Sequence, residues 1–164
     1  MSKPGWFSRL SARKPEEEGA DPAESAPMDA AEWNDKGVAL WRMGRHKEAL
    51  ACYDRGLEIA PGDSDLWMNK GAALCLLGRL EEALACCDRG LDIDPRDSVL
   101  WKNKGVVLGA LGRYEEELAC YDRGLEIDPR DSGLWKNKGV ALRALGRTQE
   151  AEACFRRARE LGGR

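Results

Sequence analysis

Tryptophan returns every 34 residues through most of this chain, at positions 33, 67, 101 and 135. The same interval carries glycine from 37 to 71, 105 and 139, and from 44 to 78, 112 and 146. A third glycine register holds positions 56, 90 and 124, and proline recurs at 61, 95 and 129. A fixed period of this length indicates a repeat protein, in which each unit buries its apolar surface against its neighbours.

Each unit predicts two helices. In the second unit, residues 67, 71, 74 and 77 share one helix face, and a second apolar stripe runs from Leu80 to Leu91. Gly78 is expected to end the first helix in the left-handed conformation, and Pro95 to end the second. The hydroxyl of Ser98 is then expected to cap the next helix. Helices this short are marginal alone, so stacking has to stabilise them.

The repeated register resembles the tetratricopeptide repeat. Its pattern W-x3-G-x2-L-x3-G-x4-A-x3-Y-x7-P is carried in the first unit by Trp33, Gly37, Leu40, Gly44, Ala49, Tyr53 and Pro61. The resemblance covers residues 30–164 as units 30–63, 64–97, 98–131 and 132–164. The amino-acid sequences of these units are similar to those of arrays from archaea and bacteria. The resemblance implies an all-α fold, an α-solenoid of four helix-turn-helix hairpins (about eight helices) that forms a right-handed superhelix with a concave groove.

The resemblance also implies a function. In tetratricopeptide proteins the first helices of successive units line a groove that receives a peptide or helix, so we expect a non-catalytic scaffold or adaptor for a protein or peptide partner. Carried over position by position, the lining residues are Asn34, Asp35, Val38, Trp41, Arg42, Met68, Asn69, Ala72, Cys75, Lys102, Asn103, Val106, Lys136, Asn137, Val140 and Arg143.

These positions include an asparagine ladder and a cluster of positive charge. The ladder is Asn69, Asn103 and Asn137, and the charges are Lys102, Lys136 and Arg143. An amide both donates and accepts hydrogen bonds, so it can pair with any peptide backbone, and the charges suit an acidic segment or a terminal carboxylate. The alternative is that duplicated repeats keep these residues as ordinary surface residues. The carboxylate clamp of chaperone-binding members is not expected, because Val106 stands where the clamp has asparagine.

One departure from the repeat concerns a position expected to be tightly packed. Glu117 stands where the other units have Ala49, Ala83 and Ala151. An ionised carboxylate there is costly unless it is paired or reaches solvent. We therefore expect the third hairpin to be locally the loosest. Unit two also departs, with Cys87 where unit one has Tyr53.

The two ends of the array carry polar substitutions. Glu152 and Arg159 replace leucines that the inner units would turn toward a following helix, and Glu32 replaces the leucine of positions 66, 100 and 134. Polar terminal faces keep repeat arrays soluble. The four units are therefore expected to form a complete array.

Residues 1–29 lie outside the repeats and are expected to form a disordered tail, because they combine four prolines with Glu16–Glu17–Glu18. Within the tail, Trp6, Phe7 and Leu10 stand among basic residues. Two interpretations stay open: an unstructured segment, or a docking peptide for a partner, a membrane surface or the groove. The alternative function is accordingly a self-associating structural module, and the chain is expected to be a monomer or a weak homo-oligomer.

Composition argues against other classes of protein. A net charge of -3 and a pI of about 5.4 give no basic footprint for nucleic acid. No apolar run approaches the roughly 20 residues that span a bilayer, and no secretory signal is present, so a cytoplasmic location is expected. The chain has one histidine, His46, and no nucleophile has a plausible partner for it. We expect no enzyme activity, no cofactor and no metal.

The cysteines also follow the repeat. Cys52, Cys86, Cys120 and Cys154 occupy equivalent positions, and stacked helices lie roughly 8–10 Å apart. A disulfide needs Cα atoms about 4.4–6.8 Å apart. Reduced thiols that pack as small apolar groups are therefore expected.

Overall fold

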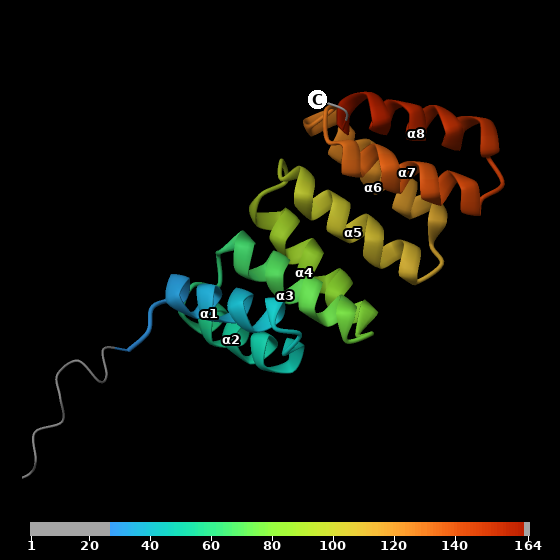
Figure 1. Cartoon of the computed structure of the whole chain (residues 1–164). Helices are drawn as coiled ribbons and strands as arrows, with labels where there is room; N and C mark the ends of the chain where they lie inside the picture. Colours follow the sequence, from blue (N-terminus) through green and yellow to red (C-terminus); the bar gives the residue numbers. More distant parts are fainter. Residues whose placement is uncertain (1–26, 163–164) are drawn as a thin grey trace, which may run out of the picture.

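The computed structural model describes residues 27–162, and all regular structure within them is helical (Figure 1). The helices are α1 (Ala30–Arg42), α2 (His46–Ile59), α3 (Ser64–Leu76), α4 (Leu80–Ile93), α5 (Ser98–Ala110), α6 (Tyr114–Ile127), α7 (Ser132–Ala144) and α8 (Thr148–Gly162). The expected all-α solenoid of helical hairpins is confirmed. The N-terminal tail up to residue 26, with its basic-aromatic segment, lies outside the described residues.

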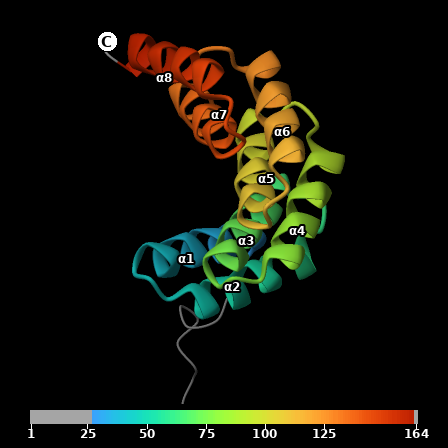
Figure 2. The same cartoon turned by 90° about the vertical axis from the view of Figure 1, so that its right-hand side faces the viewer.

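The helices pack as four successive pairs that curve into an arc. Each helix contacts its hairpin partner, and the helices of the first three pairs also contact the first helix of the next pair. The first helices also contact one another in order, α1 with α3, α3 with α5, and α5 with α7. Figure 2 shows these first helices along the inner side of the arc, with α4 and α6 on the outer side. The concave face is thus built from α1, α3, α5 and α7.

The turn within each hairpin depends on a glycine, as the spacing predicts. Gly44, Gly78, Gly112 and Gly146 have φ between 73° and 75°, a conformation that is strained for other residues. The expected cap at Ser98 is wrong. Ser98 is the first helical residue, and the N-cap is Asp97, whose carboxylate accepts the backbone N–H groups of Val99 at 2.7 Å and Leu100 at 3.2 Å.

A glycine opposite an aromatic ring brings the two helices of a hairpin together. A Cβ on Gly37 would lie 2.4 Å from the Tyr53 ring, and one on Gly105 would lie 2.4 Å from the Tyr121 ring. Only a residue without a side chain permits this approach. In the second hairpin the ring is replaced by Cys87, whose Sγ would lie 3.5 Å from a Cβ at the equivalent glycine. The second hairpin therefore has a thiol where the first and third hairpins have a ring.

The junction between hairpins explains the paired tryptophan and proline registers. Trp67 Nε1 donates to the carbonyl of Pro61 at 2.9 Å, and Trp101 and Trp135 make the equivalent bond to the preceding unit's proline. The third glycine register receives a leucine of the next unit: a Cβ on Gly90 would lie 2.9 Å from the fully buried Leu100. The repeat period is thus the spacing of one hairpin plus one such junction.

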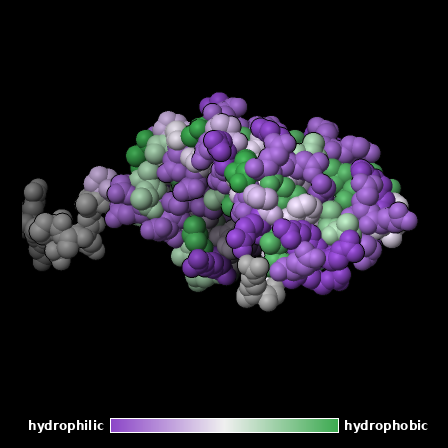
Figure 3. Space-filling model, turned by 90° about the horizontal axis from the view of Figure 1, so that it is seen from above, coloured by the Kyte–Doolittle hydropathy of each residue, from purple (hydrophilic) through white to green (hydrophobic). Residues whose placement is uncertain are grey.

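The end faces of the array are polar. Glu32 is exposed and forms a reciprocal capping box with Asp29. Glu152 and Arg159 of α8 are exposed, whereas Leu118 and Leu125, their equivalents in the third unit, are buried. Viewed from above, over α8, the surface is mostly hydrophilic with scattered apolar patches (Figure 3).

The six cysteines are free thiols. The four equivalent ones are each 5% exposed and pack as small apolar side chains. Among residues 27–162, no helix combines the length and the hydropathy that a membrane crossing requires.

Candidate functional site

The predicted lining residues all lie on the four first helices, which form the concave face. Several of them leave apolar surface open there. Trp41 is 37% exposed, Val106 43% and Val140 46%. They are joined by Leu76, which is 57% exposed. Leu76 was missed from the sequence, although it occupies the same repeat position as Arg42, so the period itself carried the signal. Apolar exposure on successive helices gives this face a row of contact points for a partner.

The asparagine ladder is not uniform. Asn69 Nδ2 donates to Asn34 Oδ1 at 2.9 Å, which ties the first two units together. Asn103 and Asn137 instead line two pockets between successive first helices. The amides nearer the C-terminus are therefore the ones that face open space.

One of the three predicted positive charges in the C-terminal half is already paired with a carboxylate of the chain. Lys102 Nζ pairs with Asp131 at 2.8 Å, and both side chains are largely covered. Arg143 lies over the ring of Phe155, with 5.4 Å between the guanidinium carbon and the ring centroid. Lys136 is exposed. Of the three predicted cations, Lys136 and Arg143 have no ion pair among the described residues, whereas Lys102 is neutralised by the residue that caps α7.

A first pocket of about 180 Å³ opens between the second hairpin and α5. It exists where Cys87 replaces the aromatic ring of the other units. We call it the thiol pocket; its lining is Trp41, Gly71, Ala72, Cys75, Leu76, Cys87, Asn103, Val106 and Val107. Burial raises the pKa of the Cys87 thiol to about 12 and also raises the pKa of Cys75. These thiols are therefore largely protonated at neutral pH and contribute apolar surface to the lining.

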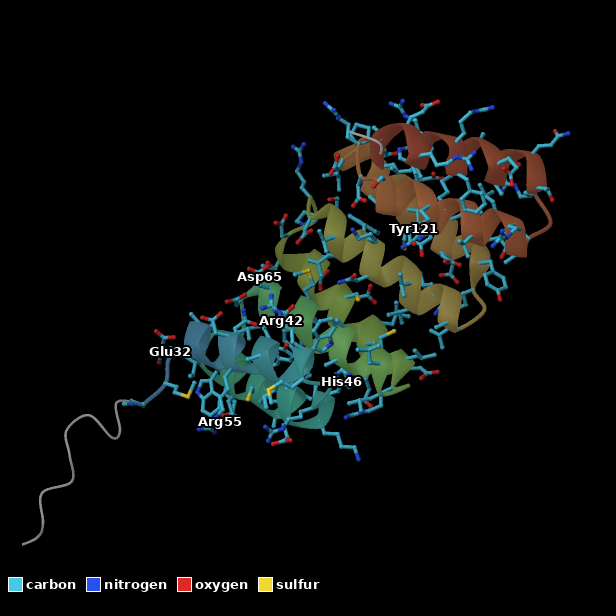
Figure 4. The ribbon with its side chains drawn as sticks, in the orientation of Figure 1. Glu32, Arg42, His46, Arg55, Asp65 and Tyr121 are labelled. Carbon is cyan, nitrogen blue, oxygen red and sulfur yellow. The ribbon has the colours of Figure 1, made fainter. Side chains whose placement is uncertain are left out.

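A second pocket of about 280 Å³ lies one unit further along, between the third hairpin and α7. We call it the Glu117 pocket; its lining is Val106, Gly109, Tyr114, Glu117, Tyr121, Asn137, Val140, Ala141 and Ala144. Val106 lines both pockets, so the two are neighbours along the concave face. Figure 4 labels Tyr121 among α5, α6 and α7.

Glu117 is buried, as its repeat position predicts, with only 7% of its surface exposed. Its Oε1 accepts the Tyr121 hydroxyl at 2.8 Å. Burial raises the pKa of the Glu117 carboxyl, and the bond from Tyr121 offsets part of that rise. Burial and the bond to Glu117 in turn raise the pKa of Tyr121. The third hairpin thus contains a carboxyl group in a poorly solvated site, and whether this loosens the hairpin stays a prediction.

A third pocket of about 580 Å³ lies on the last hairpin and contains Lys136, Val140, Arg143, Glu152 and Phe155. It occupies the side of α7 and α8 where inner hairpins receive the next unit. Within the part of the chain that the structure describes, no group of three or more His, Cys, Asp or Glu side chains could hold a metal ion.

Comparison of the sequence with models of protein families identifies the repeat. Three models described as tetratricopeptide repeat match residues 23–98, 100–131 and 120–153, which together cover most of the chain. The chain belongs to the tetratricopeptide repeat family. A search of curated proteins found no match to the sequence.

Several solved structures share the fold at low sequence identity. A crystal structure of MamA matches with a TM-score of 0.75 and 16% identity, over 82% of this chain and 78% of that one. MamA from Desulfovibrio magneticus, residue 41 to its end, has a TM-score of 0.75 and 19% identity, over 82% and 76%. The first tetratricopeptide domain of Spaghetti (RPAP3), bound to an HSP90 peptide SRMEEVD, has a TM-score of 0.69 and 24% identity, over 71% and 93%.

Within the tetratricopeptide pattern, the residues that sequence reasoning missed are those that shape the pockets. Gly109 and Tyr121 define the Glu117 pocket, and Cys87 opens the thiol pocket. Gly109 and Cys87 are visible as departures when the four units are aligned on each other: position 109 has glycine where the other units have Trp41, Cys75 and Arg143. Tyr121 follows the pattern of Tyr53 and carries no such signal. That Gly109 meets Glu117 follows only from the packing of α5 on α6.

Proposed function

We propose that this tetratricopeptide protein is a non-catalytic adaptor whose concave face binds an extended segment or a helix of a partner protein. A general role in protein interaction follows from the family. The more specific assignment is supported by the concave face itself, where exposed apolar side chains alternate with pockets that no residue of the described chain fills.

The observation that carries the proposal is the position of Val106. This side chain is 43% exposed and lines both the thiol pocket and the Glu117 pocket. A partner that crosses the first helices therefore has to pass over it. Covering an exposed apolar side chain of this size contributes on the order of 1 kcal/mol to binding.

The partner needs chemistry that matches both parts of the face. Trp41 and Leu76 offer apolar contact beside the thiol pocket, and Asn103 and Asn137 offer amides to a peptide backbone. The HSP90 peptide SRMEEVD is a ligand of Spaghetti (RPAP3), one of the proteins with a similar fold. Clamp-type capture of such an acidic tail is not proposed here, because Val106 replaces an expected clamp asparagine and Lys102 is already paired.

The test is a selection of random dodecapeptides displayed on phage against the full chain, followed by fluorescence anisotropy of the selected peptides. Val106→Gln is expected to weaken binding about fivefold or more, a loss of roughly 1 kcal/mol. Ile93→Gln is the matched control, because Ile93 is 41% exposed but lies at the end of α4, outside both pockets. A failure to select any peptide, or equal effects of the two substitutions, would show that this face is not the binding site.

A further inference from the structure

The Glu117 pocket combines two departures from the repeat that depend on each other. The other units pair a side chain at the Gly109 position with alanine at the Glu117 position. The third unit has the opposite arrangement, with no side chain at position 109 and a glutamate at position 117. The two positions compete for space, because a Cβ on Gly109 would lie 2.6 Å from Glu117 Oε2. The absence of a side chain on α5 is thus what leaves room for the carboxylate beside the groove.

The carboxylate is only half satisfied by the protein. Oε1 accepts the Tyr121 hydroxyl, whereas Oε2 accepts no hydrogen bond from residues 27–162. No lysine, arginine or histidine lines the pocket. Glu116, the preceding residue, does pair with a cation: it contacts Arg113 at 2.6 Å. A buried carboxylate without a counter-charge is costly, and a cation brought from outside to Oε2 compensates part of that cost.

The pocket also fits the stem of such a cation. Its opening on the concave face is bordered by Val106 and Val140, both exposed, and Ala144 continues the apolar wall. Lysine and arginine cover apolar surface with their methylene chains while their charged ends reach polar groups. The hydroxyl of Tyr114 and the amide of Asn137 lie in the same lining and can accept the donors that Glu117 leaves over.

We infer that the Glu117 pocket is a specificity pocket that receives a lysine or arginine side chain of the bound partner, with the cation paired to Glu117 Oε2. The inference rests on the proposed function and adds the chemical class of one partner residue. Because Val106 separates this pocket from the thiol pocket, the partner places an apolar side chain and a basic side chain on successive units of the array.

The experiment uses the full chain and the selected dodecapeptides, acetylated and amidated so that their own termini add no charge. Each lysine or arginine is replaced singly by norleucine, which keeps an unbranched apolar chain and removes the cation. One replacement is expected to weaken binding to the wild type at least tenfold and to weaken binding to Glu117→Gln less than twofold. Glu81→Gln is the control, because Glu81 is an exposed carboxylate on α4, outside the concave face and the pocket; it should keep the full norleucine penalty.

Each outcome separates the two proposals. Peptides that bind through Val106 but lack a basic residue, or whose norleucine penalty is the same in wild type and Glu117→Gln, overturn the cation pocket and leave groove binding intact. A penalty lost equally in Glu81→Gln shows a general charge effect and also overturns the cation pocket. If no peptide binds, the proposed function fails and the inference fails with it. Melting temperatures of the three proteins verify that each variant is folded.

Discussion

Gly109 of α5 and Glu117 of α6 occupy complementary space: a Cβ on Gly109 would lie 2.6 Å from Oε2 and 2.7 Å from Oε1 of Glu117. The glutamate reaches its position because the glycine has no side chain. A change at either residue therefore alters the fit of the other.

Gly109→Ala should reveal this coupling as a difference between two backgrounds. In Glu117→Ala the substitution relieves the helical cost of glycine and stabilises the protein by about 0.5–1 kcal/mol. In the wild type the new methyl group displaces the carboxylate, so the gain is reduced or reversed. Urea denaturation of the four proteins measures the coupling; equal effects of Gly109→Ala in both backgrounds would mean that the two residues do not compete for space.

Stability should depend on pH through Glu117. Because burial raises the folded pKa of this carboxyl above its ordinary value of 4.5, the folded state holds a proton that the unfolded state releases between those two pKa values. Stability therefore falls as pH rises through this window, by about 1.4 kcal/mol per unit of pKa difference. Glu117→Gln lacks this proton, so denaturation at pH 4, 5.5 and 7 should show the wild type losing stability relative to it. A constant difference would contradict the raised pKa.

The hydroxyl of Tyr121 should matter more than that of Tyr53. Tyr121 donates to Glu117, whereas Tyr53, at the same repeat position, donates to no group among residues 27–162 and faces Ala49 in place of a glutamate. Tyr121→Phe should cost about 1–3 kcal/mol, because a carboxyl group loses its donor, and Tyr53→Phe should cost less. Thermal and urea unfolding compare the two; similar costs would remove Glu117 as the cause.

Hydrogen exchange tests whether the third hairpin is locally the loosest. Amides of α5 and α6 should exchange faster than those of α3 and α4, because the latter hairpin has Ala83 at the position of Glu117. Glu117→Ala should slow exchange in α5 and α6 specifically. Unchanged protection and unchanged stability in that variant would show that the buried carboxyl does not loosen the hairpin.

Thiol labelling offers an independent view of the thiol pocket. Cys75 is the one cysteine of the six that is only partly buried, and burial raises its pKa. In the native protein a maleimide should therefore label Cys75 first, with a rate that increases with pH, and leave the five buried thiols until unfolding. A bound peptide should slow labelling at Cys75. Mass spectrometry of the labelled peptides identifies the site; equally fast reaction at Cys86 or Cys120 would contradict the packing.

The sequence by itself determined the solenoid, because a period of 34 residues reflects local requirements that recur in every unit. These requirements are the turn within a hairpin and the ends of its helices. Gly78 at a left-handed turn and Pro95 after a helix act within a few residues of chain, and both behave as predicted. The cap was misassigned for a related reason: aspartate and serine are adjacent at this junction, both are good caps, and only the backbone geometry shows that Asp97 is the capping residue.

Tertiary structure alone decided which departures from the repeat act together. Glu117 could be recognised as unusual from the alignment of units, but its contacts with Gly109 and Tyr121 depend on how closely α5 packs on α6. In the same way, the sequence predicts Lys102 as a charge available to a partner, whereas the fold places Asp131 beside it. Spacing in the sequence identifies the equivalent residues of the four units. The space and the charge around each residue depend on side chains of other helices, which only the packing brings close.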